Sequence, residues 1–188
     1  GPLARLAGTW TGKPGVDVHP SENGPEEQPY TEYYDLQPLD PQTNGPQLYY
    51  GLRYHTRITS PGEEFTFHEQ VGYWLWEPAT QTVLLTISIP RGQTALACGK
   101  SAPDASGFVL TSKRGSTFNG ILSNPFLEKN FTTTDFEMTV RFEKDGTWSY
   151  EQTTTLQVKG EGTPFLHTDR NRLRKTAEPK ANPFFLGK

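Results

Sequence analysis

The sequence has little cysteine: Cys98 is the single one among 188 residues. One cysteine excludes an internal disulfide and a metal site built from several thiolates. It suits a reducing cytoplasm, where we expect the protein to reside. Nothing near Cys98 in the sequence would stabilise a thiolate, so we expect a small buried hydrophobic side chain within a strand.

Long apolar runs and basic clusters are also lacking. No stretch approaches the roughly 18 apolar residues of a membrane-spanning helix, and no basic segment followed by an apolar one indicates a signal peptide. The 18 Lys and Arg residues face 21 Asp and Glu residues, which gives a net charge of -3. We therefore expect neither a membrane nor a nucleic acid as a partner.

Apolar residues make up only 33% of the chain, but aromatic residues reach 12% and bury a large area each. They recur with period two in short segments, which Gly, Pro, Asn and Asp separate. This pattern predicts about ten strands, at residues 9–18, 30–37, 47–58, 64–77, 82–89, 93–99, 107–113, 131–143, 147–158 and 165–175. Helical signals are confined to residues 2–6, where Pro2 begins a short turn.

Consecutive strands without crossover helices pair antiparallel, and many short strands need a closed barrel or a sandwich to protect their edges. We predict one all-β domain at residues 1–176, an up-and-down antiparallel β-barrel capped by the short N-terminal helix. A C-terminal tail is expected at residues 177–188. The segment 119–127 precedes a strand, and it is either a lid over the barrel or a packed surface loop.

The segment 64–77 carries large side chains on both faces: Phe65, Phe67, Val71, Tyr73 and Leu75 on one, and His68, Gln70, Trp74 and Trp76 on the other. One face suits the interior of a barrel around a cavity. The other face would be exposed unless another surface covers it. We predict that a second copy of the chain can cover this face in a homodimer.

Several short motifs follow one another in an informative order. Gly8-Thr9-Trp10 opens the first strand, where a Trp closes the base of small ligand-binding barrels beneath a basic side chain, here Arg172 or Arg174. The run Leu6-Ala7-Gly8-Thr9-Trp10-Thr11-Gly12 resembles the Leu-x-Gly-x-Trp-x-Gly opening of the nitrobindin-like family. The run His68-Glu69-Gln70-Val71-Gly72-Tyr73 resembles the family's His-x-Glu-x-Gly-Tyr strand, Pro90-Arg91-Gly92 a turn, and His167 the histidine of its last strand.

This resemblance spans residues 6–175. It implies a ten-stranded fatty-acid-binding-protein-like or lipocalin-like barrel that binds b-type haem, with His167 as the proximal iron ligand and His68 in the pocket near the distal face. It also implies that the haem binds nitric oxide and isomerises peroxynitrite to nitrate. The remaining expected pocket residues are Gln70, Trp74, Ile89, Arg91, Met138, Tyr150, Asp169 and Asn171.

The last strand departs from the family pattern. On a regular strand His167, Asp169 and Asn171 share one face, which makes the cavity more polar unless a bulge turns the last two outward. A buried Asp169 would need a His, an Arg or a polar ligand beside it. We expect His19, which lies in a loop beside Pro20, to be exposed.

Two other functions remain open. A haem-free carrier would bind a fatty acid or another hydrophobic molecule, with Arg91 or a tyrosine at its polar end. An acid–base enzyme would use His167, Asp169 and His68 on an organic substrate in the cavity. No Gly-x-Ser-x-Gly motif supports an acyl-enzyme mechanism.

Overall fold

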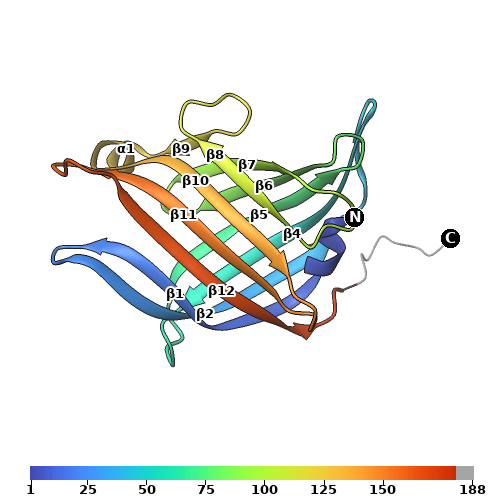
Figure 1. Ribbon diagram of the computed structural model, residues 1–188, viewed down its shortest axis with the longest axis horizontal. Helices are drawn as coiled ribbons and strands as arrows, with labels where there is room; N and C mark the ends of the chain where they lie inside the picture. Colours follow the sequence, from blue (N-terminus) through green and yellow to red (C-terminus); the bar gives the residue numbers. More distant parts are fainter. Residues whose placement is uncertain (181–188) are drawn as a thin grey trace.

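The computed structural model describes residues 1–180, which form a closed antiparallel β-barrel (Figure 1). Ten strands build its wall: β1 (Gly8–Ser21), β2 (Gly24–Pro38), β4 (Gln47–Thr59), β5 (Thr66–Glu77), β6 (Thr82–Ile89), β7 (Gln93–Lys100), β8 (Gly107–Lys113), β10 (Phe131–Phe142), β11 (Trp148–Val158) and β12 (Phe165–Ala177). The sheet closes because β2 pairs with β4 on one edge and with β1 on the other. The predicted fold class is confirmed.

Alternating side chains divide the interior from the exterior. On β10, Phe136, Met138 and Val140 are buried, while Glu137 and Arg141, which point to the other face, are exposed. Glycine and turn residues at the strand ends then fix the hairpins. The strands β6 and β8 run over the predicted residues, and β1, β2 and β12 extend further than predicted.

Three short elements were not predicted. β3 (Gln42–Asn44) pairs antiparallel with the start of β4, and β9 (Ile121–Ser123) pairs with β7 and leads into α1 (Pro125–Asn130). The prediction of helical structure at residues 2–6 alone is therefore wrong, and the segment 119–127 contains β9 and the start of α1. β7 pairs with β8 at one residue pair, Cys98 with Thr111, and β9 takes the place of β8 beside residues 93–95 of β7.

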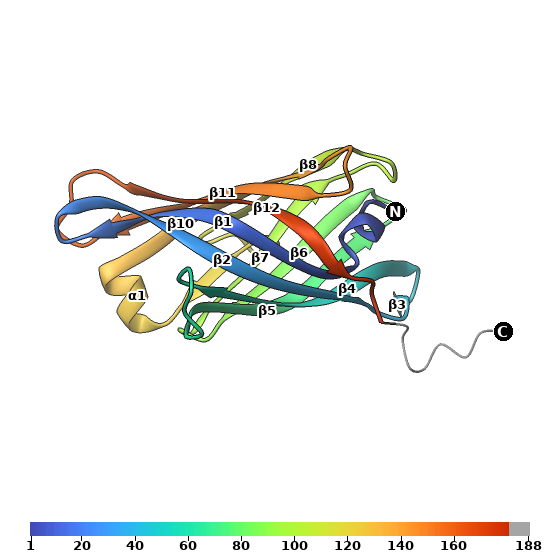
Figure 2. The same cartoon turned by 90° about the horizontal axis from the view of Figure 1, so that it is seen from below.

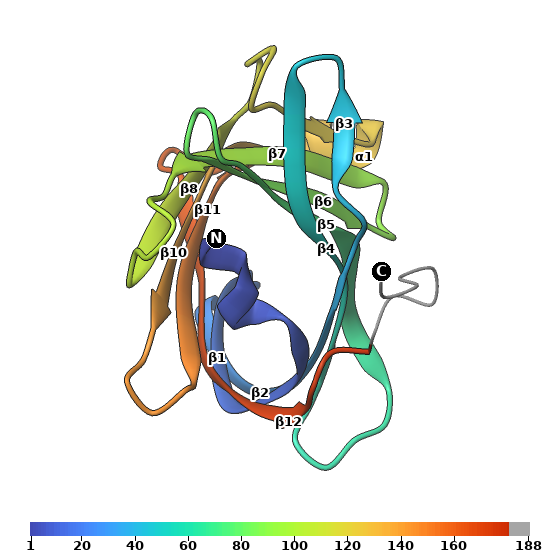
Figure 3. The ribbon, with the colours of Figure 1, turned by 90° about the vertical axis from the view of Figure 1, so that its right-hand side faces the viewer.

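One end of the barrel is closed by the 3-10 helix η1 (Pro2–Leu6). Leu3 and Leu6 are buried there, and the indole Nε1 of Trp10 donates a hydrogen bond to the carbonyl oxygen of Leu6 at 2.8 Å. Figure 3 shows η1 inside the ring of strands, and Figure 2 shows α1 near the other end. Aromatic rings fill the barrel behind η1, among them Trp10, Tyr34, Tyr54, Trp74 and Trp148.

The basic partner of Trp10 differs from the prediction. Lys175 Nζ lies 5.2 Å from the centre of the Trp10 ring, because the β1–β12 register places Trp10 opposite Lys175. Arg172 instead donates to Asp145 and Thr147. Cys98 is half-buried and not fully buried, and burial raises the pKa of its thiol.

No helix within residues 1–180 is long and apolar enough to cross a membrane. The predicted tail at 177–188 begins within β12, and from residue 181 it lies outside the described residues.

Candidate functional site

The half of the barrel away from η1 encloses a cavity of about 700 Å³, a volume within the range of small-molecule sites. Its walls differ in character. The strands β1, β2, β11 and β12 supply mainly polar side chains, among them Asp17, Tyr30, Gln152, His167 and Asp169. The strands β6, β9 and β10 with α1 supply mainly apolar ones, among them Ile87, Ile89, Ile121, Leu127 and Phe136. The cavity therefore suits a guest with an apolar body and a polar or charged group on one side.

A bulge in β1 brings an unexpected carboxylate into the polar wall. Uninterrupted alternation from Trp10 would turn Val16 and Val18 inward, but the β1 register shifts between Gly12 and Val16. Asp17 consequently faces the interior and lies opposite Asp169 of β12. Asp17 was not predicted as a site residue, because the bulge inverts the pattern that the sequence displays.

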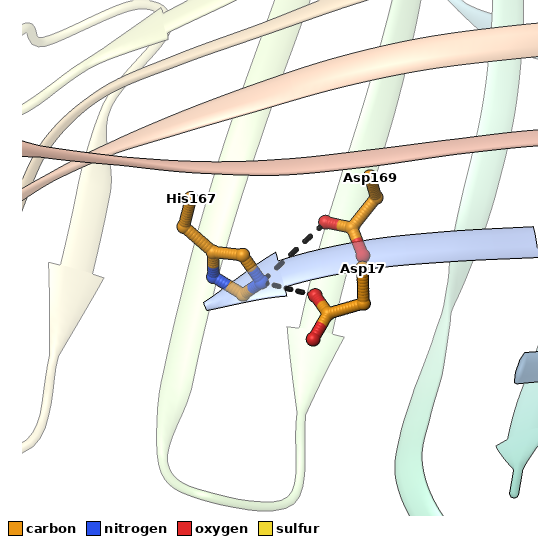
Figure 4. A group of neighbouring side chains, drawn as sticks. All are labelled: Asp17, His167 and Asp169. Atoms are coloured by element: carbon orange, nitrogen blue, oxygen red, sulfur yellow. Dashed lines mark hydrogen bonds and ion pairs between the residues drawn. The ribbon is translucent and has the colours of Figure 1, made fainter. Parts of the chain in front are cut away.

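Asp17, His167 and Asp169 form one compact cluster (Figure 4). His167 Nε2 lies 2.5 Å from Asp17 Oδ1 and 3.7 Å from Asp169 Oδ2. Both carboxylates have further partners: His19 Nδ1 lies 2.5 Å from Asp17 Oδ2, and Gln152 donates to Asp169 Oδ2 at 2.9 Å. The expectation that a buried Asp169 finds a histidine partner is confirmed. The expectation that His19 is exposed is wrong, because β1 continues past His19 and turns it toward Asp17.

The cluster alters the acidity of its members. Burial raises the pKa of Asp169 to about 7, and the adjacent Asp17 carboxylate adds to this rise. Burial also acts to raise the pKa of Asp17, but the hydrogen bonds to His167 and Asp169 outweigh it, so this pKa is lowered. For His167, burial acts to lower the pKa, and the neighbouring carboxylates raise it above its ordinary value. Asp17 is thus ionised at neutral pH and favours the protonated form of His167.

The other predicted residues at the cavity are His68, Gln70, Ile89 and Arg91. Burial, assisted by the positive charge of Arg91, lowers the pKa of His68, so its imidazole is neutral at neutral pH. Gln70 Nε2 donates to the hydroxyl of Tyr54 at 2.7 Å. These residues supply neutral hydrogen-bonding groups and one cation to the cavity.

Four predicted pocket residues do not line this cavity. Trp74, Met138, Tyr150 and Asn171 point inward as their strand parity predicts, but they lie in the filled part of the barrel. Trp74 Nε1 donates to Tyr34 Oη at 2.9 Å there. Strand parity tells inside from outside, but it does not tell how far along the barrel the filled part extends.

Beneath the cavity, Glu32 is only 2% exposed and receives three hydrogen bonds. Thr56 Oγ1 donates to Oε1 at 3.0 Å, and Tyr150 Oη and Asn171 Nδ2 each donate to Oε2 at 2.9 Å. Burial nevertheless raises the pKa of Glu32. The hydroxyl of Tyr30, which lines the cavity, lies 2.8 Å from that of Tyr150 and links this network to the cavity.

The barrel and its cavity agree with the comparison to known families. The family model of the THAP4-like, heme-binding β-barrel domain matches residues 1–175. The chain belongs to this nitrobindin-like family. Family membership supports a ligand-binding barrel.

A solved structure shares this architecture. The crystal structure of Rv2717c from M. tuberculosis is similar to the chain with a TM-score of 0.65 and 20% sequence identity, over 93% of this chain and 95% of that one. At this identity the likeness shows the fold. A search of curated proteins found no match to the chain.

Proposed function

We propose that the cavity binds haem b and that His167 is its axial protein ligand. The observation that carries the proposal is the position of His167 on the wall of a cavity in a barrel of a haem-binding family. The single cysteine rules out a Cys-x-x-Cys-His attachment motif, so the haem would be bound without a covalent link. The apolar wall opposite His167 suits a flat porphyrin.

The donor set fits haem in part. A single imidazole on one side of the cavity is a standard axial ligand and leaves the opposite iron position open. In this structure, however, Asp17 holds the Nε2 atom that iron would take. For iron to bind Nε2, the hydrogen bond between His167 and Asp17 must first break. Asp17 therefore lowers the affinity of the protein for haem.

When bound, the iron would supply an open coordination position for nitric oxide or peroxynitrite, the ligands proposed from the nitrobindin-like resemblance. The residues of this chain would orient such a guest. Neutral His68 can donate or accept a hydrogen bond within the cavity, and Arg91 attracts an anion to it.

Hemin titration followed by the Soret band tests this proposal. We expect a saturable band in the wild type that His167→Ala abolishes or shifts. His55→Ala is the matched control, because His55 bonds to Glu69 and its side chain is 43% exposed. A wild-type protein without a Soret band, or equal binding by His167→Ala, would contradict the proposal.

The paired polar and apolar walls support a second candidate, which is an organic molecule with a hydrophobic body. The protein would then act as a carrier, or as an acid–base enzyme in which Asp17 orients His167 as general base. Mass spectrometry of the extract obtained by delipidating the purified protein separates the carrier from the enzyme. A co-purified lipid supports the carrier, and an empty extract counts against it.

A further inference from the structure

We infer that Asp17, His167 and Asp169 form a binding site for one divalent first-row transition-metal cation when haem is absent. The inference goes beyond the proposed haem function and does not depend on it. One imidazole and two carboxylates supply mixed nitrogen and oxygen ligands, which suit zinc, iron or manganese.

The geometry of the cluster carries the inference. One donor atom from each of the three side chains lies within 4.8 Å of the other two, as ligands around one ion do. The three side chains are fixed on two paired strands: Asp17 lies opposite Asp169 in the β1–β12 register, and His167 lies two residues earlier on the same face of β12. Because Nε2 of His167 is hydrogen-bonded to Asp17 Oδ1, a cation would take the place of the hydrogen in this bond.

The charge of the cluster points the same way. The side chains of Asp17 and Asp169 are only 12% and 13% exposed, so water screens the charges within the cluster poorly. A divalent cation that displaced the protons shared within the cluster would compensate both carboxylates at once. A haem iron would not compensate both carboxylates, because the porphyrin occupies its equatorial positions and leaves one axial position for the protein on this side. The two carboxylates are thus better explained by a bare cation than by haem.

Side chains that are not themselves proposed ligands orient the two carboxylates by hydrogen bonds, as in established metal sites. His19 holds the second oxygen of Asp17, and Gln152 donates to Asp169. Three protein ligands would leave at least one coordination position facing the cavity, which is the arrangement of catalytic metal sites. A guest in the cavity with an oxygen or nitrogen donor can reach that position.

Isothermal titration of haem-free, chelator-treated protein with Zn²⁺ tests the inference, with Co²⁺ absorption as a spectroscopic report of ligation. We expect one Zn²⁺ per chain and a Co²⁺ ligand-field band. Asp169→Asn and His167→Ala should each weaken Zn²⁺ binding by roughly 100-fold or more, and Gln152→Leu by roughly 10- to 100-fold. The matched control is Asp104→Asn, because Asp104 is exposed in a loop. It should bind Zn²⁺ as the wild type does.

Hemin titration of the same variants separates this inference from the proposed function. Asp169→Asn should lose Zn²⁺ binding and retain hemin binding, which also shows that the variant is folded, whereas His167→Ala should lose both. Absence of Zn²⁺ binding in the wild type, or unchanged binding by Asp169→Asn, would overturn the inference and leave the haem proposal standing. Zn²⁺ binding without hemin binding would support the inference and contradict the haem proposal.

Discussion

His167 Nε2 lies 2.5 Å from Oδ1 of Asp17, a residue 150 positions earlier in the chain. The bond joins the imidazole expected to bind iron to an ionised carboxylate whose pKa is lowered. Any ligand that needs the Nε2 atom must first displace Asp17. The affinity of the site for haem therefore depends on the charge of Asp17 as much as on the presence of His167.

Replacement of Asp17 by Asn should strengthen hemin binding. The amide keeps the shape of the side chain but replaces a charge-assisted hydrogen bond with a neutral one. The neutral bond is weaker by about 1 kcal/mol. We expect the hemin dissociation constant to fall by roughly 5- to 10-fold in a Soret titration. Asp104→Asn should leave it unchanged. Weaker binding by Asp17→Asn would instead show that this carboxylate assists the haem.

Glu32 should make the stability of the barrel depend on pH. Burial raises its pKa, so the folded chain binds the Glu32 proton more tightly than the unfolded chain does. Its contribution to stability is therefore greatest below the unfolded pKa and is lost as pH rises through the folded pKa. Glu32→Gln cannot ionise and escapes this loss.

Urea unfolding at pH values from below the unfolded pKa of Glu32 to above its folded pKa measures the effect. The free energy of unfolding of Glu32→Gln should rise relative to the wild type as pH increases, by at most about 1.4 kcal/mol per pH unit. The exposed Glu161→Gln variant should follow the wild-type curve. Parallel curves for Glu32→Gln and the wild type would contradict the raised pKa.

Asn124 should hold α1 against the barrel. Its Oδ1 accepts from the backbone amides of Phe126 and Leu127 at 2.7 and 3.1 Å, and its Nδ2 donates to the carbonyl of Arg91 at 2.6 Å. Asn124→Ala removes all three bonds and should cost about 1–2 kcal/mol of helix stability. Hydrogen exchange should accelerate at the amides of residues 126–130, while the amides of β12 serve as an internal control. Unchanged exchange in α1 would show that other contacts fix it.

The predicted homodimer is open to a direct test on the outer face of β5. Val71 and Tyr73 are 45% and 44% exposed there. If this face is covered by a second copy, Tyr73→Lys should shift gel filtration from a dimer to the 21.1 kDa monomer. Val109→Lys on β8, at a similarly exposed residue, is the control. A wild type that elutes at the monomer mass would contradict the dimer.

The strands could be predicted from the sequence because each one alternates polar and apolar residues between turn-forming residues. The residues of β6 and β8 follow from that pattern alone. In α1, six residues form a helix because Asn124 caps it and bonds to Arg91, and that contact comes from a distant turn. Periodicity in so short a segment carries no helical signal.

The candidate site could be predicted only on its β12 side. The parity of the last strand placed His167 and Asp169 on one inward face, and the structure agrees. Asp17 was missed because the register shift in β1 inverts parity after Gly12, and His19 was missed because β1 was predicted to end at residue 18. An unbroken alternating pattern would have pointed to Val16 and Val18 instead, so the residues that matter most to the chemistry were hidden by a local irregularity.

The position of the cluster on β1 and β12 also orders its assembly in time. These are the first and last strands of the barrel wall, so they can pair only after β12 has been synthesised. During synthesis on the ribosome, Asp17 emerges early and must wait for β12 before it meets His167. Occupation of the site by any ligand would therefore report that the last strand has paired with the first, and a ligand bound there would oppose separation of β1 from β12.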